Sequence, residues 1–388
     1  MLKVIVGHSE DPDSREAIEE VLEQCLEELD DLKPQAGLLF AAIDFDYAVL
    51  LDEINRAFPG IDLIGCTTDA EISSVLGFQQ NSISLTLFIS DSIQIHAGIG
   101  LDTQENVCRA ARQAVAQATE NTTQAPKLCI ALPVSYVAKE SVVSGEEVLA
   151  GLDTALGSHV PIVGGAAGDR ARFQKTYQFF GTQVYTNALP VLIFSGELLL
   201  SYGTGCGWEP MGRKSLITKS CGNVLYEIEG MSAIDFYKQY LGDRVPGKDN
   251  PLAVYVGDSD RYYLRVPNFQ NTEDGSISFL GDIPEQSFVQ LTGVSRNQII
   301  ESSRKSFEMA RKRYPGARPD ALLIFSCCAR RWRLGTRAKE EYQLVRDALQ
   351  DDLPASGFYT YGEFAPLDRS ASNTFHEETF VTVLIGDA

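Results

Sequence analysis

The chain has 388 residues, of which 44% are hydrophobic and 22% charged, and its formal net charge at pH 7 is −20. This composition is typical of a folded globular protein, and no run approaches the roughly 18 apolar residues that a membrane-spanning helix needs. The negative charge opposes broad attraction to nucleic-acid phosphates or anionic lipids. Residues 1–7 read as a short strand rather than an export signal. We therefore expect a cytoplasmic protein that binds neither nucleic acid nor membrane.

The eight cysteines contain no C-x-x-C pair. Neither a zinc ribbon nor a redox dithiol is therefore indicated by their spacing. We expect most of them to be reduced thiols in the core.

One plan occurs three times along the chain. In each copy a short apolar strand ends at or just before a glycine, a polar candidate for the helix N-cap follows, and apolar residues then recur at helical spacing before a second strand. The first strands are predicted at residues 1–7, 93–97 and 288–292, and the second strands at residues 38–43, 128–134 and 321–327.

Each copy continues with a second amphipathic helix and an apolar strand that runs into a turn of mostly small residues with an acid behind it. The acids are Glu71, Asp169 and Glu363, and a further strand begins after each turn. Strands joined by helices of this length favour parallel or mixed sheets with the helices packed outside. The predicted fold class is α/β to α+β, with mixed sheets layered with helices and built from three copies of a strand–helix–strand–helix–strand unit.

Residues 198–286 do not follow this plan. They hold a glycine-rich strand exit, one predicted helix near residues 232–241 and several predicted strands. We therefore place a domain boundary near residue 220, with two copies in residues 1–220 and one copy plus an inserted strand-rich segment in residues 221–388.

The repeated stretches resemble the FIST family of sensory proteins, which have a FIST N and a FIST C domain. The resemblance is best in Ile64-Gly65-Cys66-Thr67-Thr68-Asp69-Ala70-Glu71, in Val163-Gly164-Gly165-Ala166-Ala167-Gly168-Asp169, and in a C-terminal group made of Phe325-Ser326-Cys327, residues 357–363 and His376. It covers nearly the whole chain. The resemblance implies a FIST N-type domain over residues 1–220 and a FIST C-type domain over residues 221–388.

What the resemblance implies is a ligand-binding sensory protein rather than an enzyme. Such modules are coupled to histidine kinases, cyclases or diguanylate-type enzymes, and no output domain is visible in this sequence, so we expect a separate signalling partner such as a histidine kinase or a cyclic-nucleotide enzyme. One branch resembles nitric-oxide-sensing haem proteins, and amino acids have been proposed as ligands for the family. Haem with nitric oxide is therefore the leading expectation. There are two alternatives. One is a sensor of an amino acid or related metabolite, and the other is a cysteine-dependent enzyme.

A haem site needs an axial donor, usually a neutral imidazole presented to an apolar pocket. Of the four histidines, His376 is favoured because it follows Phe375 and matches the C-terminal histidine of the family. The aromatic turn with Tyr359 and Tyr361 is close in sequence. The alternative for His376 is a hydrogen bond to a neighbouring loop.

The glycine turns, Gly164-Gly165 above all, could cradle an anion with backbone N–H groups. Neither a dinucleotide-binding nor a P-loop signature is present, and tight strand packing is the alternative explanation. If the turns meet at the carboxyl ends of strands, as ligand sites of α/β sheets do, Asp169 and Glu363 could bind the ammonium of an amino acid and Arg330 its carboxylate.

Cys327 and Cys328 end an apolar strand and precede Arg330 and Arg331, whose positive charge would lower a thiol pKa. A catalytic role would also need a histidine and an acid partner, which the sequence does not show. The predicted ligand-binding residues are Gly164, Gly165, Asp169, Cys327, Arg330, Tyr359, Tyr361, Glu363 and His376, with His376 as the candidate haem ligand.

Overall fold

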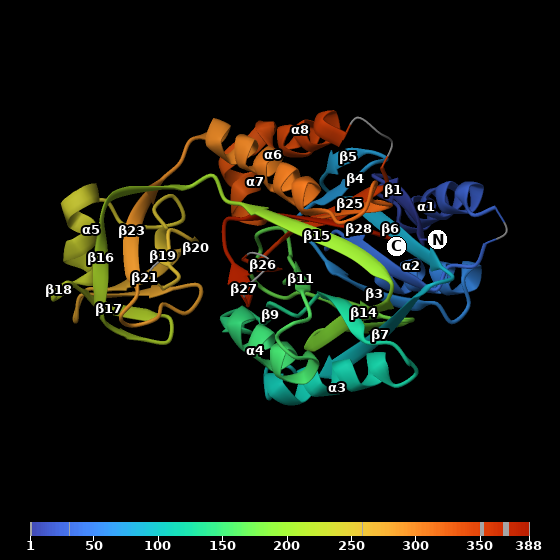
Figure 1. The fold of residues 1–388 in the computed structure, drawn as a ribbon, viewed down its shortest axis with the longest axis horizontal. Coiled ribbons are helices and arrows are strands. Elements are labelled where there is room, and N and C mark those ends of the chain that lie inside the picture. Colours follow the sequence, from blue (N-terminus) through green and yellow to red (C-terminus); the bar gives the residue numbers. More distant parts are fainter. Residues whose placement is uncertain (1, 31, 258, 350–352, 368–371, 388) are drawn as a thin grey trace.

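The computed structural model describes residues 2–30, 32–257, 259–349, 353–367 and 372–387. A large body of sheets and helices carries a smaller strand-rich domain on one side (Figure 1). The small domain is an insertion, because the chain enters it after Gly205 and returns to the body at Ser295.

The helices begin at polar caps, as the sequence predicts. Asp13 accepts hydrogen bonds from two amide N–H groups of the first turn of α1, and Ser295 forms a capping box with Gln298 in α6. Within the part of the chain that the structure describes, no helix is long and apolar enough to span a bilayer. The helices are α1 (Ser14–Glu28), α2 (Tyr47–Ala57), α3 (Val107–Thr119), α4 (Gly145–Leu156), α5 (Ala233–Leu241), α6 (Arg296–Arg313), α7 (Cys328–Leu334) and α8 (Lys339–Leu349).

The three predicted copies form three sheets of one topology. In each copy the strands lie in the order first, fourth, second, third, and the second and third strands are parallel. The strands of copy 1 are β1 (Leu2–Ser9), β2 (Ala36–Ala41), β3 (Asp62–Thr67) and β6 (Ile83–Ser90). Those of copy 2 are β7 (Ile93–Leu101), β8 (Pro126–Ala131), β11 (Ile162–Gly165) and β14 (Ala188–Gly196). Those of copy 3 are β15 (Leu198–Gly205), β24 (Ala321–Cys327), β25 (Ala355–Thr360) and β28 (Phe380–Asp387).

Each sheet is completed by two short strands from another copy. The hairpin of copy 1 joins the sheet of copy 3, that of copy 2 joins copy 1, and that of copy 3 joins copy 2. The three copies are therefore interlocked in a cycle. The exchanged strands are β4 (Glu71–Ser73), β5 (Gly77–Gln79), β12 (Gln178–Phe180), β13 (Gln183–Tyr185), β26 (Glu363–Pro366) and β27 (Asn373–His376).

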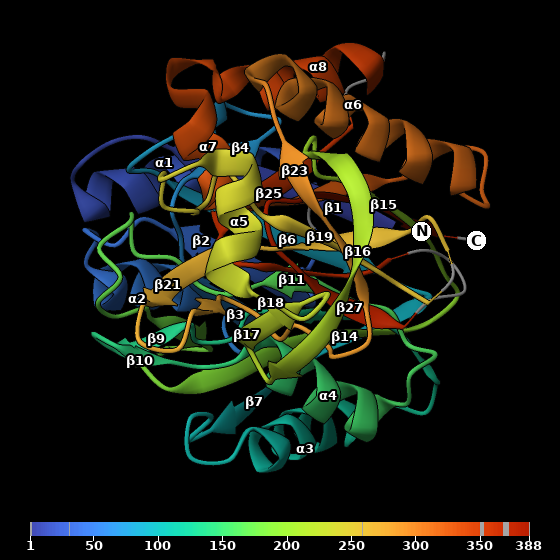
Figure 2. The ribbon, with the colours of Figure 1, turned by 90° about the vertical axis from the view of Figure 1, so that its left-hand side faces the viewer.

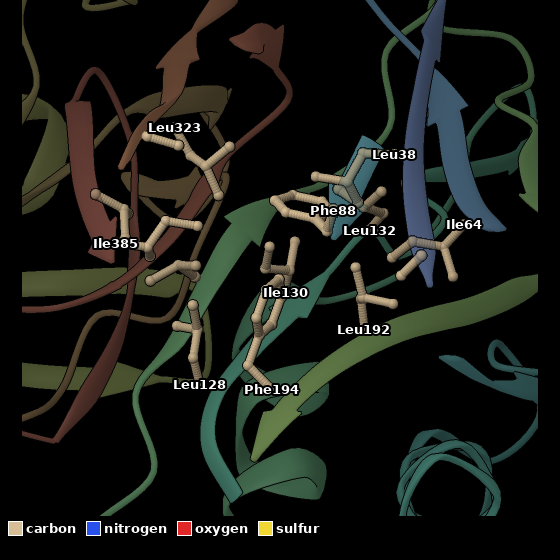
Figure 3. Close-up of a cluster of buried hydrophobic side chains, with 14 of the residues drawn as sticks. Leu38, Ile64, Phe88, Leu128, Ile130, Leu132, Leu192, Phe194, Leu323 and Ile385 are labelled. Atoms are coloured by element: carbon tan, nitrogen blue, oxygen red, sulfur yellow. The ribbon is translucent and has the colours of Figure 1, made fainter. Parts of the chain in front are cut away.

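The inner faces of the three sheets share one core. Phe88 of copy 1 meets Phe194 of copy 2 edge to face, with ring centroids 5.2 Å apart. Leu323 and Ile385 of copy 3 belong to the same cluster (Figure 3). The helices cover the outer faces, with α6 and α8, α3 and α4, and α1 and α2 on three different sides (Figure 2). The predicted α/β class with mixed sheets and outer helices is confirmed.

The first strand of copy 3 differs from the prediction. It is β15, whereas the predicted residues 288–292 lie in β23 (Phe288–Gly293) of the small domain. The insertion separates β15 from α6 by about ninety residues, so that sequence order conceals the match. The glycines could have revealed it. A Cβ at Gly98 would come within 2.0 Å of Ala114 O, and one at Gly203 within 2.0 Å of Ser306 O, because this strand packs on its helix in both copies.

The small domain has its own apolar core, formed by one antiparallel sheet and α5. The predicted boundary near residue 220 falls inside its longest strand, β16 (Glu209–Cys221). The remaining strands are β17 (Val224–Ile228), β18 (Met231–Ser232), β19 (Leu252–Tyr255), β20 (Tyr262–Arg265), β21 (Pro267–Asn271), β22 (Ser276–Phe279) and β23.

Candidate functional site

The three small-residue turns meet at one end of the body. The Asp69 amide donates to Tyr359 O (3.0 Å), the Ala166 amide to Gly362 O (3.0 Å), and the Gly168 amide to Thr67 O (2.8 Å). Each turn thus bonds to a turn or strand end of another copy. The expected meeting at the ends of the third strands is observed.

A cavity of about 480 Å³ lies beside this junction and is lined by copy 2, copy 3 and the small domain. Copy 2 contributes the segment after β8, copy 3 contributes α7 and the segment before β28, and the small domain contributes Lys248, Val266 and Leu280. The carboxyl ends of β8 and β24 therefore open into one space, where α/β folds commonly bind ligands. The aromatic side chains along its wall are Tyr136, Phe173, Trp332, Tyr361 and Phe375.

The Asp169 carboxylate holds part of this wall in place. It accepts hydrogen bonds from the amides of Phe173, Gln174 and Lys175 and from the Tyr361 hydroxyl (2.6 Å). The ring of Phe173 stacks on Tyr361 with centroids 5.1 Å apart. Asp169, which we predicted to bind ligand directly, is thus occupied by protein donors and orients two aromatic rings that face the cavity.

The Asp69 carboxylate fixes α7 against the first copy. Its Oδ2 accepts from Arg331 Nε (2.6 Å) and from Trp332 Nε1 (3.1 Å). Trp332 in turn meets Phe173 edge to face, at 5.6 Å between centroids. All three copies therefore contribute to the position of this wall.

The floor of the cavity is acidic and buried. Both carboxylate oxygens of Glu378 lack a hydrogen-bond partner, although the residue is 1% exposed. Burial raises the pKa of Glu378 well above its usual value. Glu377 is paired with Arg265 of the small domain (3.6 Å), yet burial still raises its pKa to about 8. Lys248 reaches in from the small domain, with its Nζ 5.4 Å from the Trp332 ring centroid.

Cys327 also lines the cavity, at the junction of β24 and α7. A hydrogen bond from the Cys328 thiol lowers the pKa of Cys327 to about 7 against the opposing effect of burial, with help from the amides of Ala329 and Glu378 and the charge of Arg330. Burial instead raises the pKa of Cys328 far above its usual value. The two neighbours therefore differ in charge state near neutral pH.

The predicted anion cradle at Gly164 and Gly165 is tightly packed. A Cβ at Gly164, whose φ is +126°, would meet Ala131 O at 2.2 Å, and one at Gly165 would meet the Thr360 side chain at 2.6 Å. Neither glycine is among the residues that line the cavity. Close approach of strand and turn explains both glycines.

The turn acids Glu71 and Glu363 occupy equivalent positions in copies 1 and 3, each three residues after a threonine. Glu363 accepts from Thr360 Oγ1 (2.7 Å), and Glu71 accepts from Thr68 and Ser82 hydroxyls. Burial raises the pKa of both carboxyls, to about 7 for Glu71.

Glu71 gives a pH-dependent prediction. Because its folded-state pKa is above the ordinary value, the folded state binds this proton more tightly, and stability falls as pH rises through 7. Glu71→Gln is isosteric but does not titrate. The difference in unfolding free energy between this variant and the unmodified protein should therefore shift in favour of the variant by about 2–3 kcal/mol from pH 5 to pH 8. Urea denaturation at both pH values measures this difference. An equal effect at the two pH values would contradict it.

Two other predicted ligand residues are committed to the interior. Arg330 is fully buried, pairs with buried Glu341 (2.6 Å) and donates to backbone carbonyls of Gly205, Cys206 and Ile299. The Tyr359 hydroxyl donates to the same Glu341 (2.7 Å). These residues join the second half of copy 3 to its first strand.

His376 lies in β27 and is 2% exposed. Its Nε2 is 3.1 Å from Ala365 O, and burial lowers its pKa to about 4, so the ring is neutral at pH 7. It lines a second cavity of about 560 Å³ on the other side of β27 rather than the first. The described residues contain no cluster of three or more His, Cys, Asp or Glu side chains placed to hold a metal ion.

Several lining residues were not predicted from the sequence. Trp332, Phe173, Lys248 and the Glu377–Glu378 pair come from four separate segments. One signal was available, since Glu377 and Glu378 interrupt the approach to an apolar strand just after the predicted His376. The others depend on the exchange of hairpins and on the small domain.

Comparison with known families resolves the classification. Residues 35–231 match the FIST N domain and residues 233–366 match the FIST C domain. The chain belongs to the FIST family. FIST domains are sensory domains of signal transduction proteins, typically ligand-binding.

Other similarities of this FIST protein are remote. The uncharacterized protein MJ1623 of Methanocaldococcus jannaschii is 27% identical over 160 residues, which cover 37% of this chain and 31% of that protein. The chain thus spans about a third of that relative. Two cyanuric acid hydrolase structures are similar at 11% and 9% identity. One, from A. caulinodans, has a TM-score of 0.31 over 53% of this chain and 72% of its own; the other, described as evolutionary innovation by structural concatenation, has 0.37 over 100% of both chains.

Proposed function

We propose that this FIST protein senses a small molecule with an apolar body and one polar group, bound in the 480 Å³ cavity between copies 2 and 3 and the small domain. One observation carries the proposal. Aromatic rings from two copies enclose a floor where the buried Glu378 carboxyl has no protein partner. A buried polar group without a partner is costly, and a ligand that bonds to it removes that cost.

The binding state is transmitted by the small domain. The small domain contributes Lys248 and Val266 to the cavity wall. It joins the body by only two connections, after β15 and before α6 (Figure 1). A ligand that contacts both parts favours the closed arrangement by its differential affinity. The surface that then changes is read by a separate signalling protein, such as a histidine kinase or a cyclic-nucleotide enzyme.

An amino acid is one member of the proposed ligand class. Its ammonium would be held by Glu377 and Glu378 rather than by Asp169 and Glu363, and Lys248 rather than Arg330 would face its carboxylate. The reason is that Arg330 is saturated by carbonyls, hydroxyls and Glu341.

Haem does not fit the predicted grouping. The Nε2 of His376 is engaged by Ala365 O, and the hydroxyls of Tyr359 and Tyr361 are engaged by Glu341 and Asp169. These side chains do not converge on one apolar pocket, as a haem ligand set must. We therefore expect haemin to give no saturable binding in the test below.

The two tryptophans allow the proposal to be tested by fluorescence, because Trp332 lines the cavity whereas Trp208 lies in the connection to the small domain. In the Trp208→Phe variant, we titrate the twenty standard amino acids, hexan-1-ol and haemin. A ligand in the cavity is expected to change Trp332 emission saturably. The control variant Trp332→Phe keeps Trp208. If no compound changes Trp332 emission, or if only the control responds, the cavity is not the binding site.

A further inference from the structure

The cavity places a nucleophile and an acid side by side. Cys327 and Glu378 both line it, and the Glu378 amide donates to the Cys327 sulfur. Glu378 has a φ of +60°, a backbone conformation that non-glycine residues rarely adopt. Such backbone strain is concentrated at functional sites, where the surrounding structure maintains it.

The sulfur is surrounded by donors. The Cys328 thiol and the amides of Ala329 and Glu378 point to it, and Arg330, which donates to Glu378 O (3.2 Å), adds positive charge. A thiolate is the reactive form of cysteine, and hydrogen-bond donors of this kind favour it. At the buried Cys25, Cys66 and Cys129 the effect of burial dominates and raises the thiol pKa.

The acid has a free carboxyl. Glu378 is 1% exposed, and neither of its side-chain oxygens has a partner in the protein. The other charged or titratable groups that act on it are Cys327, Arg330, Glu377 and Lys248. The Glu377 carboxyl already accepts a hydrogen bond from the Val266 amide, and the Glu363 carboxyl one from the Thr379 amide. Glu378 is therefore the acid positioned to give a proton to an atom bound in the cavity.

We propose that Cys327 is a covalent capture site for small aldehydes, with Glu378 as the proton donor. The sulfur bonds to the carbonyl carbon, the C=O π bond breaks, and the oxygen takes the Glu378 proton to give a neutral hemithioacetal. The carboxylate left on Glu378 regains a proton from solvent. The aromatic wall binds the organic body of the aldehyde.

The product suits a sensor rather than an enzyme. A hemithioacetal has sulfur as its leaving group, so the adduct returns to aldehyde and thiol unless an oxidant intervenes. None of the described residues that line the cavity is a histidine that could activate water for another outcome. The inference rests on the proposed function, because it specifies which ligand chemistry the same cavity recognises.

The first test measures protection of the full chain from iodoacetamide at pH 7.5. Fragment-ion mass spectrometry of the tryptic peptide 314–330 distinguishes Cys327 from Cys328, and we expect Cys327 to be alkylated at least about tenfold faster. Hexanal should slow this alkylation at about a tenfold lower concentration than hexan-1-ol, which has the same chain without the carbonyl. Equal labelling of the two cysteines would overturn the proposal.

The second test separates capture from simple binding. Glu378→Gln should slow the Trp332 fluorescence change after mixing with hexanal by about 100-fold, because a general acid contributes at least this much. Alkylation by iodoacetamide should be unchanged within about threefold, since that reaction expels iodide and needs no proton. If hexanal and hexan-1-ol protect equally, capture is excluded while the binding cavity stands. If neither protects Cys327 or changes Trp332 emission, both proposals fail.

Discussion

Arg330→Ala is expected to lower the free energy of unfolding by about 3–5 kcal/mol, because it leaves the buried Glu341 carboxylate without its cation. Both side chains are fully buried and 2.6 Å apart, and the guanidinium also satisfies carbonyls of β15, α6 and Glu378. Urea denaturation followed by circular dichroism measures the loss.

Arg333→Ala is the matched control. Arg333 is on the same helix, but it is 37% exposed and pairs with exposed Asp249. Surface pairs of this kind contribute about 0–1 kcal/mol. If Arg330→Ala lowers the free energy of unfolding no more than Arg333→Ala does, and also weakens ligand binding, the sequence-based expectation that Arg330 binds a ligand carboxylate would be supported instead.

The second large effect is expected at Arg265, which joins the small domain to the body. Its guanidinium pairs with Glu146 (2.9 Å) and Glu377 (3.6 Å) of the body and donates to Phe375 O (3.1 Å). Across the same contact, the amide of Val266 donates to Glu377 (2.6 Å). Arg265→Met should weaken this contact by about 3 kcal/mol, because Glu146 and Glu377 lose their buried cationic partner.

Hydrogen exchange measures this prediction locally. The Val266 amide should exchange about 100-fold faster in Arg265→Met, because opening of the domain contact exposes it. Lys214→Met is the control, since Lys214 pairs with fully exposed Asp260 within the small domain. Unchanged exchange at Val266 would show that Arg265 does not hold the two parts together.

The repeat could be predicted from the sequence because it depends on local patterns. Helix caps such as Asp13, apolar faces and strand-ending glycines recur in all three copies, and each of these is set by residues close in the chain. The mistaken first strand of copy 3 has a different cause. A well-formed strand of the insertion, β23, precedes α6 directly in sequence, whereas β15 contacts α6 only in space.

The candidate site was harder to predict because its members are brought together by exchange between copies. Cys327 and Tyr361 were predicted and do line the cavity. Arg330 follows Cys327 by three residues, yet it points into the protein, and one sequence cannot distinguish a buried arginine from a ligand-binding one. Lys248 reaches the site from the small domain, whose position no local pattern encodes.

The pH dependence of Glu71 has the opposite sign to that of His376. The buried Glu71 carboxyl makes the fold less stable as pH rises through 7. The buried neutral imidazole of His376 makes it less stable as pH falls from 6.5 through about 4. Comparison of Glu71→Gln with the unmodified protein isolates the first effect, because both proteins share His376.

The most direct test of the central claim is thermal denaturation of the blocked cavity. Ala329 lines the cavity and is only partly buried, so Ala329→Phe fills space without displacing core atoms, and Ala329→Ser is the control of similar size. A compound that changes Trp332 emission should raise the melting temperature of the unmodified protein and of Ala329→Ser, because it binds the folded state. It should leave Ala329→Phe unchanged. An equal rise in all three proteins would place the ligand elsewhere and contradict the account.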